Sequence, residues 1–222
     1  MCGRFTLTAD PAELQDEFGD YTFPSRFAPR FNVAPSQPVL AIPNDDKLKA
    51  DFFVWGLIPM WAKDPAIGAR LINARGETLA EKPSFRGSYR HKRCLILADG
   101  FYEWKSAAGK KTKTPYYIHM KDRKLFAMAG LWDAWASPDG SSIKTCAIIT
   151  TTPNELMGSI HDRMPVILHA RDYAKWLNPA PQTPEALQPL IKPFPADAMS
   201  AYRVSTQVNK AMNDMPELVV PA

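Results

Sequence analysis

Short apolar stretches dominate the chain, and they predict more strands than helices. Strands are expected over residues 51–57, 94–98, 101–105, 115–119, 125–131 and 143–151. Alternation within 101–105 would place Phe101 and Glu103 on one face of its strand, with Tyr102 and Trp104 on the other. Many of these segments are joined by short turns, which is typical of antiparallel sheets.

Three helical segments are predicted around these strands. Residues 9–18 begin with Asp10 as a potential N-cap and Pro11 in the first turn. Leu14 and Phe18 then share one face of that helix. The other two segments cover residues 171–177 and 183–191. The pattern indicates an α+β fold, mainly an antiparallel β-sheet or open barrel core flanked by a few helices.

Composition is that of an ordinary globular protein. The chain has 222 residues, of which 45% are hydrophobic and 23% charged, so it can bury a core without metal or disulfides. We expect a single domain over 1–222, with the Pro-rich stretch 178–195 as a surface excursion. No apolar stretch approaches the ~20 residues of a membrane span. The N-terminus has no basic flank followed by an apolar block, so the sequence predicts no secretory signal.

The cysteines are three in number and widely spaced, at Cys2, Cys94 and Cys146. This usage favours a reducing, cytoplasmic location over a disulfide scaffold. Cys94 and Cys146 lie in apolar strand patterns and are expected to be buried thiols. The chain contains no CxxC or HxxxH spacing, so we expect neither a metal nor another cofactor.

Positive charge is concentrated in one part of the chain. The net charge is +4, but residues 86–124 hold eleven Lys or Arg and three acids, 11 − 3 = +8, which leaves −4 for the rest. A basic stretch in an otherwise slightly acidic chain predicts a polyanionic partner. The alternative is a pair of solvated hairpin loops, because residues 110–113 (KKTK) are typical of a turn.

Cys2 is the most distinctive candidate for chemistry. Removal of Met1 would leave an α-amine and a thiol on one residue, and an exposed 1,2-aminothiol traps an aldehyde as an imine and then a thiazolidine ring. A terminal cysteine can also act as an acyl-transfer nucleophile, and it can occur by chance. If Met1 stays in place, the α-amine is acylated and the aldehyde chemistry fails.

Two further residues suit acid–base chemistry. His161 lies in a short polar segment between Ile160 and Pro165, where an imidazole can reach a site, although it could instead cap a turn. Glu103 is surrounded by aromatic residues, which would raise its proton affinity into a useful range. The alternative for Glu103 is an edge-strand position facing water.

Polar residues that could hold an anion occur in two places. Asn73 and Arg75 share one face of an extended segment, where an amide beside a guanidinium suits a phosphate or sugar. Arg4, close to Cys2, would extend that subsite. The alternative for each arginine is a surface ion pair.

Aromatic residues near position 60 could stack on nucleobases. Trp61 follows a Pro–Met pair and precedes polar residues, so we expect it at the surface, where stacking contributes ~1–3 kcal/mol per base. Trp55 is flanked by apolar residues and is expected in the core.

The order of these motifs resembles the SOS-response-associated peptidase (SRAP) family, whose members shield abasic sites in DNA. The motifs that carry the resemblance are MCGRF at 1–5, RFNVAP at 30–35, WGLIP at 55–59, NARGET at 73–78, DGFYEW at 99–104 and HDRMP at 161–165. A tail from 204 to 209 also resembles the end of the family's sequences, so the resemblance covers essentially the whole chain.

The resemblance implies a mechanism. His161 would assist opening of the abasic sugar, the Cys2 amine and thiol would capture its aldehyde, and Glu103 would shuttle protons. Asn73 would hold the sugar or its phosphate. Flanking phosphates and bases would be held by Arg4, Arg75, Arg163, Pro35 and Trp61. The imine stage could also lead to strand cleavage as a lyase side activity.

The expected partner is therefore single-stranded or junction DNA with an abasic site, bound without sequence preference. We expect a monomer in the cytoplasm, associated with the nucleoid and not with membranes. Two alternatives stay open: a thiol peptidase that uses Cys2, including on its own first residue, and a non-catalytic single-strand-binding module.

Overall fold

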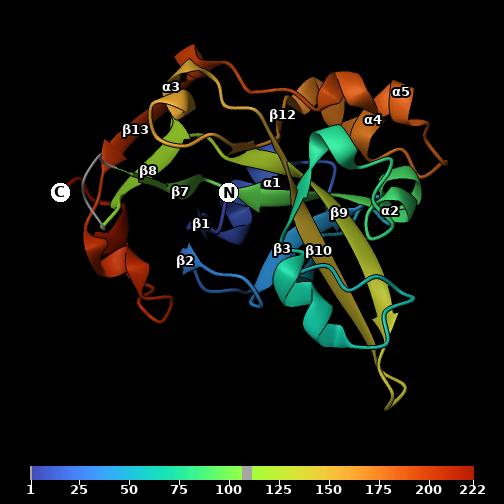
Figure 1. Cartoon of the computed structure of the whole chain (residues 1–222). Coiled ribbons are helices and arrows are strands. Elements are labelled where there is room, and N and C mark those ends of the chain that lie inside the picture. The colour runs from blue at the N-terminus through green and yellow to red at the C-terminus, as the bar shows by residue number, and fades with distance from the viewer. Residues whose placement is uncertain (1, 107–111) are drawn as a thin grey trace.

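The computed structural model describes residues 2–106 and 112–222, and its longer strands form two sheets (Figure 1). The first sheet is antiparallel throughout, in the order β13-β8-β7-β1-β2. Its strands are β1 (Arg4–Leu7), β2 (Arg30–Val33), β7 (Gly100–Lys105), β8 (Thr114–Met120) and β13 (Met199–Arg203). The predicted turn over 110–113 lies partly outside the described residues.

The second sheet closes into a ring in the order β10-β4-β3-β6-β9, because β9 also pairs with β10. Its main strands are β3 (Pro38–Pro43), β4 (Asp51–Trp55), β6 (Arg93–Ala98), β9 (Phe126–Ala136) and β10 (Ser142–Thr151). The α+β fold with a mainly antiparallel core is confirmed. The barrel is closed rather than open, since the long strands β9 and β10 pair over seven consecutive positions and join the two edges.

Short strands and two parallel pairings complete the barrel. They are β5 (Asn73–Arg75), β11 (Met164–Pro165) and β12 (Ile167–Leu168). Strand β10 runs parallel to β4 and to β5 and antiparallel to β11. Residues 73–75 and 164–165 are therefore brought to the same strand from distant parts of the sequence.

The helices are short, and most lie on the side of the barrel away from the first sheet, whereas the helix at residues 155–158 lies beside β13 of that sheet (Figure 1). The α-helices are α1 (Pro11–Glu17), α2 (Arg86–His91), α3 (Glu155–Gly158), α4 (Tyr173–Trp176) and α5 (Pro184–Leu187). The 3₁₀ turns are η1 (Pro65–Arg70), η2 (Gly76–Thr78), η3 (Ala170–Asp172), η4 (Gln188–Leu190), η5 (Ala196–Ala198), η6 (Thr206–Asn209) and η7 (Pro216–Val219). Among the described residues no helix is both long and apolar enough to span a bilayer.

The predicted helix over 9–18 is confirmed, with Asp10 and Glu13 forming a reciprocal capping box at its start. The segments predicted at 171–177 and 183–191 are helical but split. Each combines one α-helical turn with a 3₁₀ turn. In the second segment, Pro184 begins the α-helical turn and Pro189 lies in the 3₁₀ turn that follows it.

Two apolar clusters pack on the two faces of the barrel strands. One joins barrel residues such as Phe53 and Ile96 to Phe5 and Phe101 of the first sheet. The other joins barrel residues to helical ones, including Trp176. The predictions that Trp55, Cys94 and Cys146 are core residues are confirmed, since all three are buried and both cysteines are free thiols.

Candidate active site at the N-terminal strand

Cys2 lies where the N-terminal strand meets β7. The antiparallel register pairs Arg4 with Tyr102 and Phe5 with Phe101, so the chain before β1 runs toward Glu103. The Cys2 side chain is 0% exposed and packs in the apolar cluster between the two sheets. Our expectation of an exposed thiol is therefore wrong for the chain that begins with Met1. The cause is tertiary, because residues of both sheets pack around Cys2.

Electrostatics around Cys2 favour the thiol over the thiolate. Burial raises the pKa of the Cys2 thiol, and the charge of Glu103 raises it further. The Sγ atom lies 4.0 Å from the carbonyl oxygen of Arg4, to which the thiol donates. A neutral thiol is a weak first nucleophile, so an amine on the same residue would react first.

Glu103 is an acid held in a water-poor position. Its side chain is 2% exposed, and burial raises the pKa of its carboxyl group, an effect that His161 partly offsets. Strand β7 directs Phe101 and Glu103 to the same side, as the alternation predicts, while Tyr102 packs in a different apolar cluster. A carboxyl group with a raised pKa can both give and take a proton near neutrality.

His161 faces Glu103 across the site. Its Nε2 lies 3.9 Å from Oε2 of Glu103. Helix α3 positions the ring, because the main-chain amide of His161 donates to the Met157 carbonyl at 2.8 Å. At the other ring nitrogen, Nδ1 lies 3.1 Å from the Arg163 amide nitrogen, which donates to it, and 2.9 Å from the exposed carboxylate of Asp162. These contacts hold the ring with Nε2 directed at Glu103.

Strand β5 contributes Asn73, the fourth residue of this site. Its Nδ2 donates to the main-chain carbonyl of Cys2 at 2.8 Å. The start of β5 is fixed by Ile72, whose carbonyl accepts both the Trp55 indole N–H at 2.8 Å and the Ile148 amide at 3.1 Å. The Asn73 Oδ1 is buried without a hydrogen bond among the described residues, so it can accept one from a bound molecule.

The three arginines of the predicted anion site lie in different environments. Arg75 is exposed and has no ion pair within the described chain. Arg4 donates to Asn32 Oδ1 and to the carbonyls of Val208 and Asn209, so it holds the C-terminal segment. Both terminal nitrogens of Arg163 bind Glu77, at 2.6 and 2.9 Å. Of the three, only Arg75 is an exposed residue.

Trp61 and Pro35 lie on loops next to β4. Trp61 is 58% exposed, as predicted, and Pro35 is half-buried. The loop that carries Trp61 turns at Gly56, which has a φ of 137°. A Cβ at this position would lie only 2.8 Å from the Gly68 carbonyl oxygen, so the turn requires glycine.

Asn32, in the RFNVAP motif, is buried and has a structural role that the sequence did not predict. Its side-chain Nδ2 donates to the carbonyls of Val208, Lys210 and Asn213 in the C-terminal segment. The only signal in the sequence was an asparagine between the apolar residues Phe31 and Val33. Asn32 therefore fixes Arg4 and the C-terminal segment beside the N-terminal strand.

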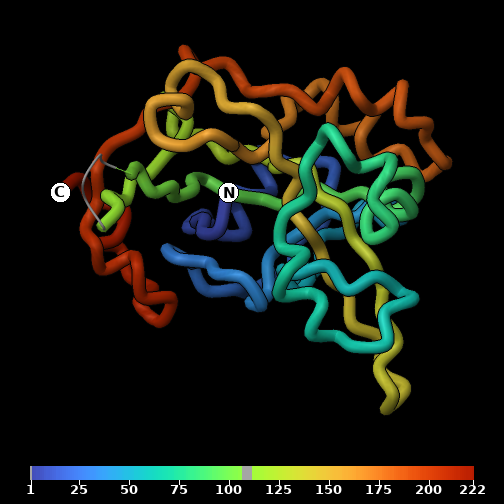
Figure 2. The backbone as a smooth tube through the Cα atoms, in the orientation of Figure 1, coloured from blue at the N-terminus to red at the C-terminus, as the bar shows by residue number. Residues whose placement is uncertain are grey.

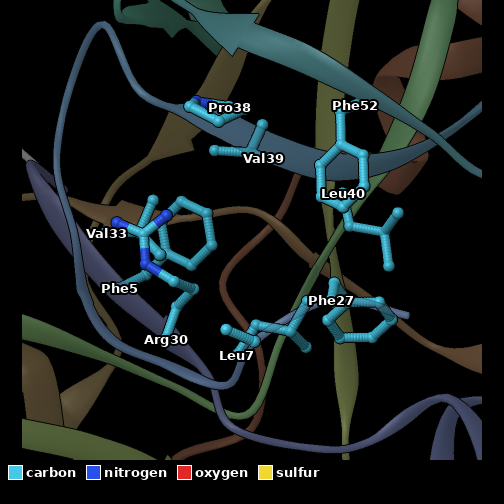
Figure 3. A pocket seen from close by; sticks show the side chains of 10 residues that line it. Phe5, Leu7, Phe27, Arg30, Val33, Pro38, Val39, Leu40 and Phe52 are labelled. Carbon is cyan, nitrogen blue, oxygen red and sulfur yellow. The ribbon is translucent and has the colours of Figure 1, made fainter. Parts of the chain in front are cut away.

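An apolar cavity of about 190 Å³ opens between the first sheet and the barrel (Figure 3). Its walls include Phe27, Leu40 and Phe52, and Arg30 is its single charged residue. It lacks groups for acid–base chemistry, so the cluster around Cys2 is the better candidate active site.

The described residues contain no group of three or more His, Cys, Asp or Glu that could hold a metal ion.

Comparison with known families agrees with this arrangement of motifs. The family model described as SOS response associated peptidase (SRAP) matches residues 1–211. The chain belongs to the SRAP family. Among curated SRAP relatives, "Abasic site processing protein YoqW" of Bacillus subtilis (strain 168) is 51% identical over 222 residues, which cover 99% of each chain.

More distant relatives retain the whole SRAP region. "Abasic site processing protein HMCES" of Gallus gallus is 34% identical over 265 residues, covering 100% of this chain and 78% of that protein. A crystal structure of a protein from Bacteroides thetaiotaomicron superposes on the SRAP chain with a TM-score of 0.89 at 30% identity, over 100% of both chains.

Proposed function

We propose that this SRAP protein binds single-stranded or junction DNA at abasic sites and cross-links to them through Cys2, shielding the lesion from strand cleavage. The observation that carries the proposal is the convergence of Cys2, Asn73, Glu103 and His161 from four separate segments. The printed names of the SRAP relatives, which describe abasic site processing, support the same substrate.

The chemistry begins with the sugar. An abasic deoxyribose is mostly a closed ring, and a proton delivered by His161 to the ring oxygen favours the open aldehyde. The Cys2 α-amine adds to C1′ and water leaves, which gives an imine. The sulfur then bonds to the same carbon and its proton passes to nitrogen, which closes a thiazolidine ring. Glu103 carries protons for the addition and for the loss of water.

The raised pKa of the Cys2 thiol fits this order of steps. A largely protonated thiol leaves the amine as the first nucleophile and reacts only once the imine carbon is held beside it. Closing the ring consumes the imine, from which β-elimination would break the strand. The same groups therefore support a lyase side activity whenever ring closure is slow.

The proposal requires that Met1 be removed. Only then does Cys2 carry a free amine, and the side chain that is buried in the chain beginning with Met1 must then admit the aldehyde. A thiol peptidase would instead need an activated thiolate, and burial beside Glu103 disfavours that charge state. We favour cross-linking because the relatives are named for abasic site processing.

A cross-linking assay tests the proposal. Purified protein without Met1 is incubated with a single-stranded oligonucleotide carrying one abasic site and run on a denaturing gel. We expect a slow-migrating band that Cys2→Ala abolishes. The same protein with an extra peptide before Cys2 should give no band. A non-catalytic binding module predicts no band for any variant, and that result would end the proposal.

A further inference from the structure

Glu77 and Arg163 form an ion pair that makes two parallel contacts. Nη1 of Arg163 lies 2.6 Å from Oε1 of Glu77, and Nη2 lies 2.9 Å from Oε2. Nη2 also donates to the main-chain carbonyl of Thr150, on β10, at 2.7 Å. The side chain of Arg163 is 14% exposed and that of Glu77 is 47% exposed. A guanidinium that binds both oxygens of a carboxylate fixes the orientation of the two groups as well as attracting them.

This ion pair connects the segments that carry Asn73 and His161. Glu77 lies in η2, directly after β5, and is four residues from Asn73. Arg163 directly precedes β11 and is two residues from His161. Both strands pair with β10, β5 in parallel and β11 antiparallel (Figure 2). The pair therefore sets the position of the His161 segment relative to the Asn73 segment, with β10 as the common support.

The main chain of Arg163 is also what orients the imidazole ring. Its amide donates to Nδ1 of His161 at 3.1 Å, while Nε2 on the other side of the ring lies 3.9 Å from Oε2 of Glu103. Because only one residue separates His161 from Arg163, a shift of the Arg163 main chain displaces the donor that holds the ring. Proton transfer is sensitive to such displacements.

Stability alone gives little reason for the Glu77 carboxylate. An ion pair with a half-exposed member contributes little to the free energy of unfolding. The hydrogen bonds from Arg163 lower the pKa of Glu77, so its carboxylate keeps its charge at neutral pH. The main consequence of the pair is therefore geometric.

We infer that Glu77 is a positioning residue for His161 and acts through Arg163. The inference rests on the proposed function. Glu77 takes no proton from the sugar and forms no bond to it. Its carboxylate anchors the Arg163 side chain, the Arg163 amide anchors Nδ1 of His161, and Nε2 is thereby held where it serves the opening of the abasic sugar. The resemblance to the SRAP family implies a phosphate as the partner of Arg163, whereas this inference assigns its terminal nitrogens to Glu77 and Thr150.

Glu77→Gln tests the inference, because it keeps the shape of the side chain and removes the charge and one acceptor. Cross-linking rates are measured in single turnovers at saturating DNA, where affinity makes no contribution. With an abasic site we expect a loss of about 10-fold. With an oligonucleotide whose aldehyde lies on an acyclic linker, no ring must open, and the rate should stay within about 2-fold of wild type. The matched control is Glu81→Gln, which removes the same charge from an exposed position four residues away and should match wild type.

A double-mutant cycle tests the route through the imidazole. In a His161→Gln background, Glu77→Gln should cause no further loss of the abasic-site rate. Equal slowing with both aldehydes, or losses that multiply in the double variant, would overturn the inference. An unchanged rate together with a steeper salt dependence of DNA binding would also overturn it, and would assign Arg163 to a phosphate.

Hydrogen exchange of the Arg163 amide gives a measurement that needs no DNA. In the free protein, NMR should show this amide exchanging about 10-fold faster in Glu77→Gln than in wild type. The Val166 amide, which donates to the Ile149 carbonyl at 2.8 Å, should exchange at the same rate in both proteins and reports on the fold. Unchanged exchange at Arg163 would refute the positioning role.

The two proposals can fail separately. If the wild-type protein without Met1 forms no cross-link with abasic DNA, the proposed function fails. If the cross-link forms but Glu77→Gln changes neither the abasic-site rate nor the exchange of the Arg163 amide, only the positioning role of Glu77 is refuted.

Discussion

The side-chain amide of Asn73 holds the main-chain carbonyl of Cys2, at 2.8 Å between Nδ2 and the oxygen. This hydrogen bond joins strand β5 to the N-terminal strand and sets where the Cys2 amine would lie. Asn73 therefore has two tasks, since its buried Oδ1 can accept a hydrogen bond from the bound sugar.

Asn73→Ala should slow cross-linking about 10-fold at saturating DNA, because one neutral hydrogen bond contributes roughly 1 kcal/mol. The rate is measured from gel time courses under single-turnover conditions. Asn178→Ala, at an exposed position, is the matched control and should match wild type. Equal rates for both variants would show that Asn73 does not position Cys2.

Glu103→Gln should slow cross-linking by about 100-fold, because the amide cannot exchange protons. It should also stabilise the fold at pH 7. The pKa of Glu103 is raised in the folded state, so the unfolded chain loses that proton first and stability falls as pH rises above the ordinary Glu range. Each pKa unit corresponds to about 1.4 kcal/mol.

Urea unfolding of wild type and Glu103→Gln tests whether the substitution raises the free energy of unfolding. The variant should be the more stable protein at pH 7, and its advantage should disappear below pH ~4, where both states of the wild type are protonated. A variant that is less stable than wild type at pH 7 would contradict the account of Glu103 as a buried acid.

His161→Gln should slow the opening of the abasic sugar ring. With abasic DNA we expect a loss of about 100-fold in the cross-linking rate. With an aldehyde that has no hemiacetal ring, the loss should be at least 10-fold smaller, because no ring must open. Intact mass of the product measures both rates. Equal losses for the two substrates would place His161 in a later step.

Arg75 and Arg4 should differ in the salt dependence of DNA binding. Arg75 is exposed and unpaired among the described residues, so Arg75→Ala should reduce the slope of log affinity against log salt by about 0.7. Arg4 has both terminal nitrogens bound within the protein, so Arg4→Ala should leave the slope unchanged and lower the melting temperature. The reverse pattern would contradict these assignments.

The sequence predicted elements where local pattern decides structure. The capping box at Asp10 and the alternation across Phe101 and Glu103 both hold in the fold. Strands β1, β2 and β3 were not predicted, because they are short or interrupted by proline and depend on pairing with distant segments.

The site was predictable in its members but not in its geometry. Asn73 and Cys2 are 71 residues apart, and His161 and Glu103 meet only through the packing of α3 against the sheets. Only the resemblance grouped them beforehand. The burial of Cys2 and the pairing of Arg163 with Glu77 depend on tertiary packing, which no local pattern records.

Intact mass spectrometry tests the central claim most directly. Protein without Met1 is treated with abasic DNA, the DNA is digested with nuclease, and the modified peptide is sequenced. The account predicts a sugar-phosphate adduct on Cys2, formed with loss of one water, and none on the Cys2→Ala protein. An unmodified Cys2, or an adduct on a lysine, would contradict it.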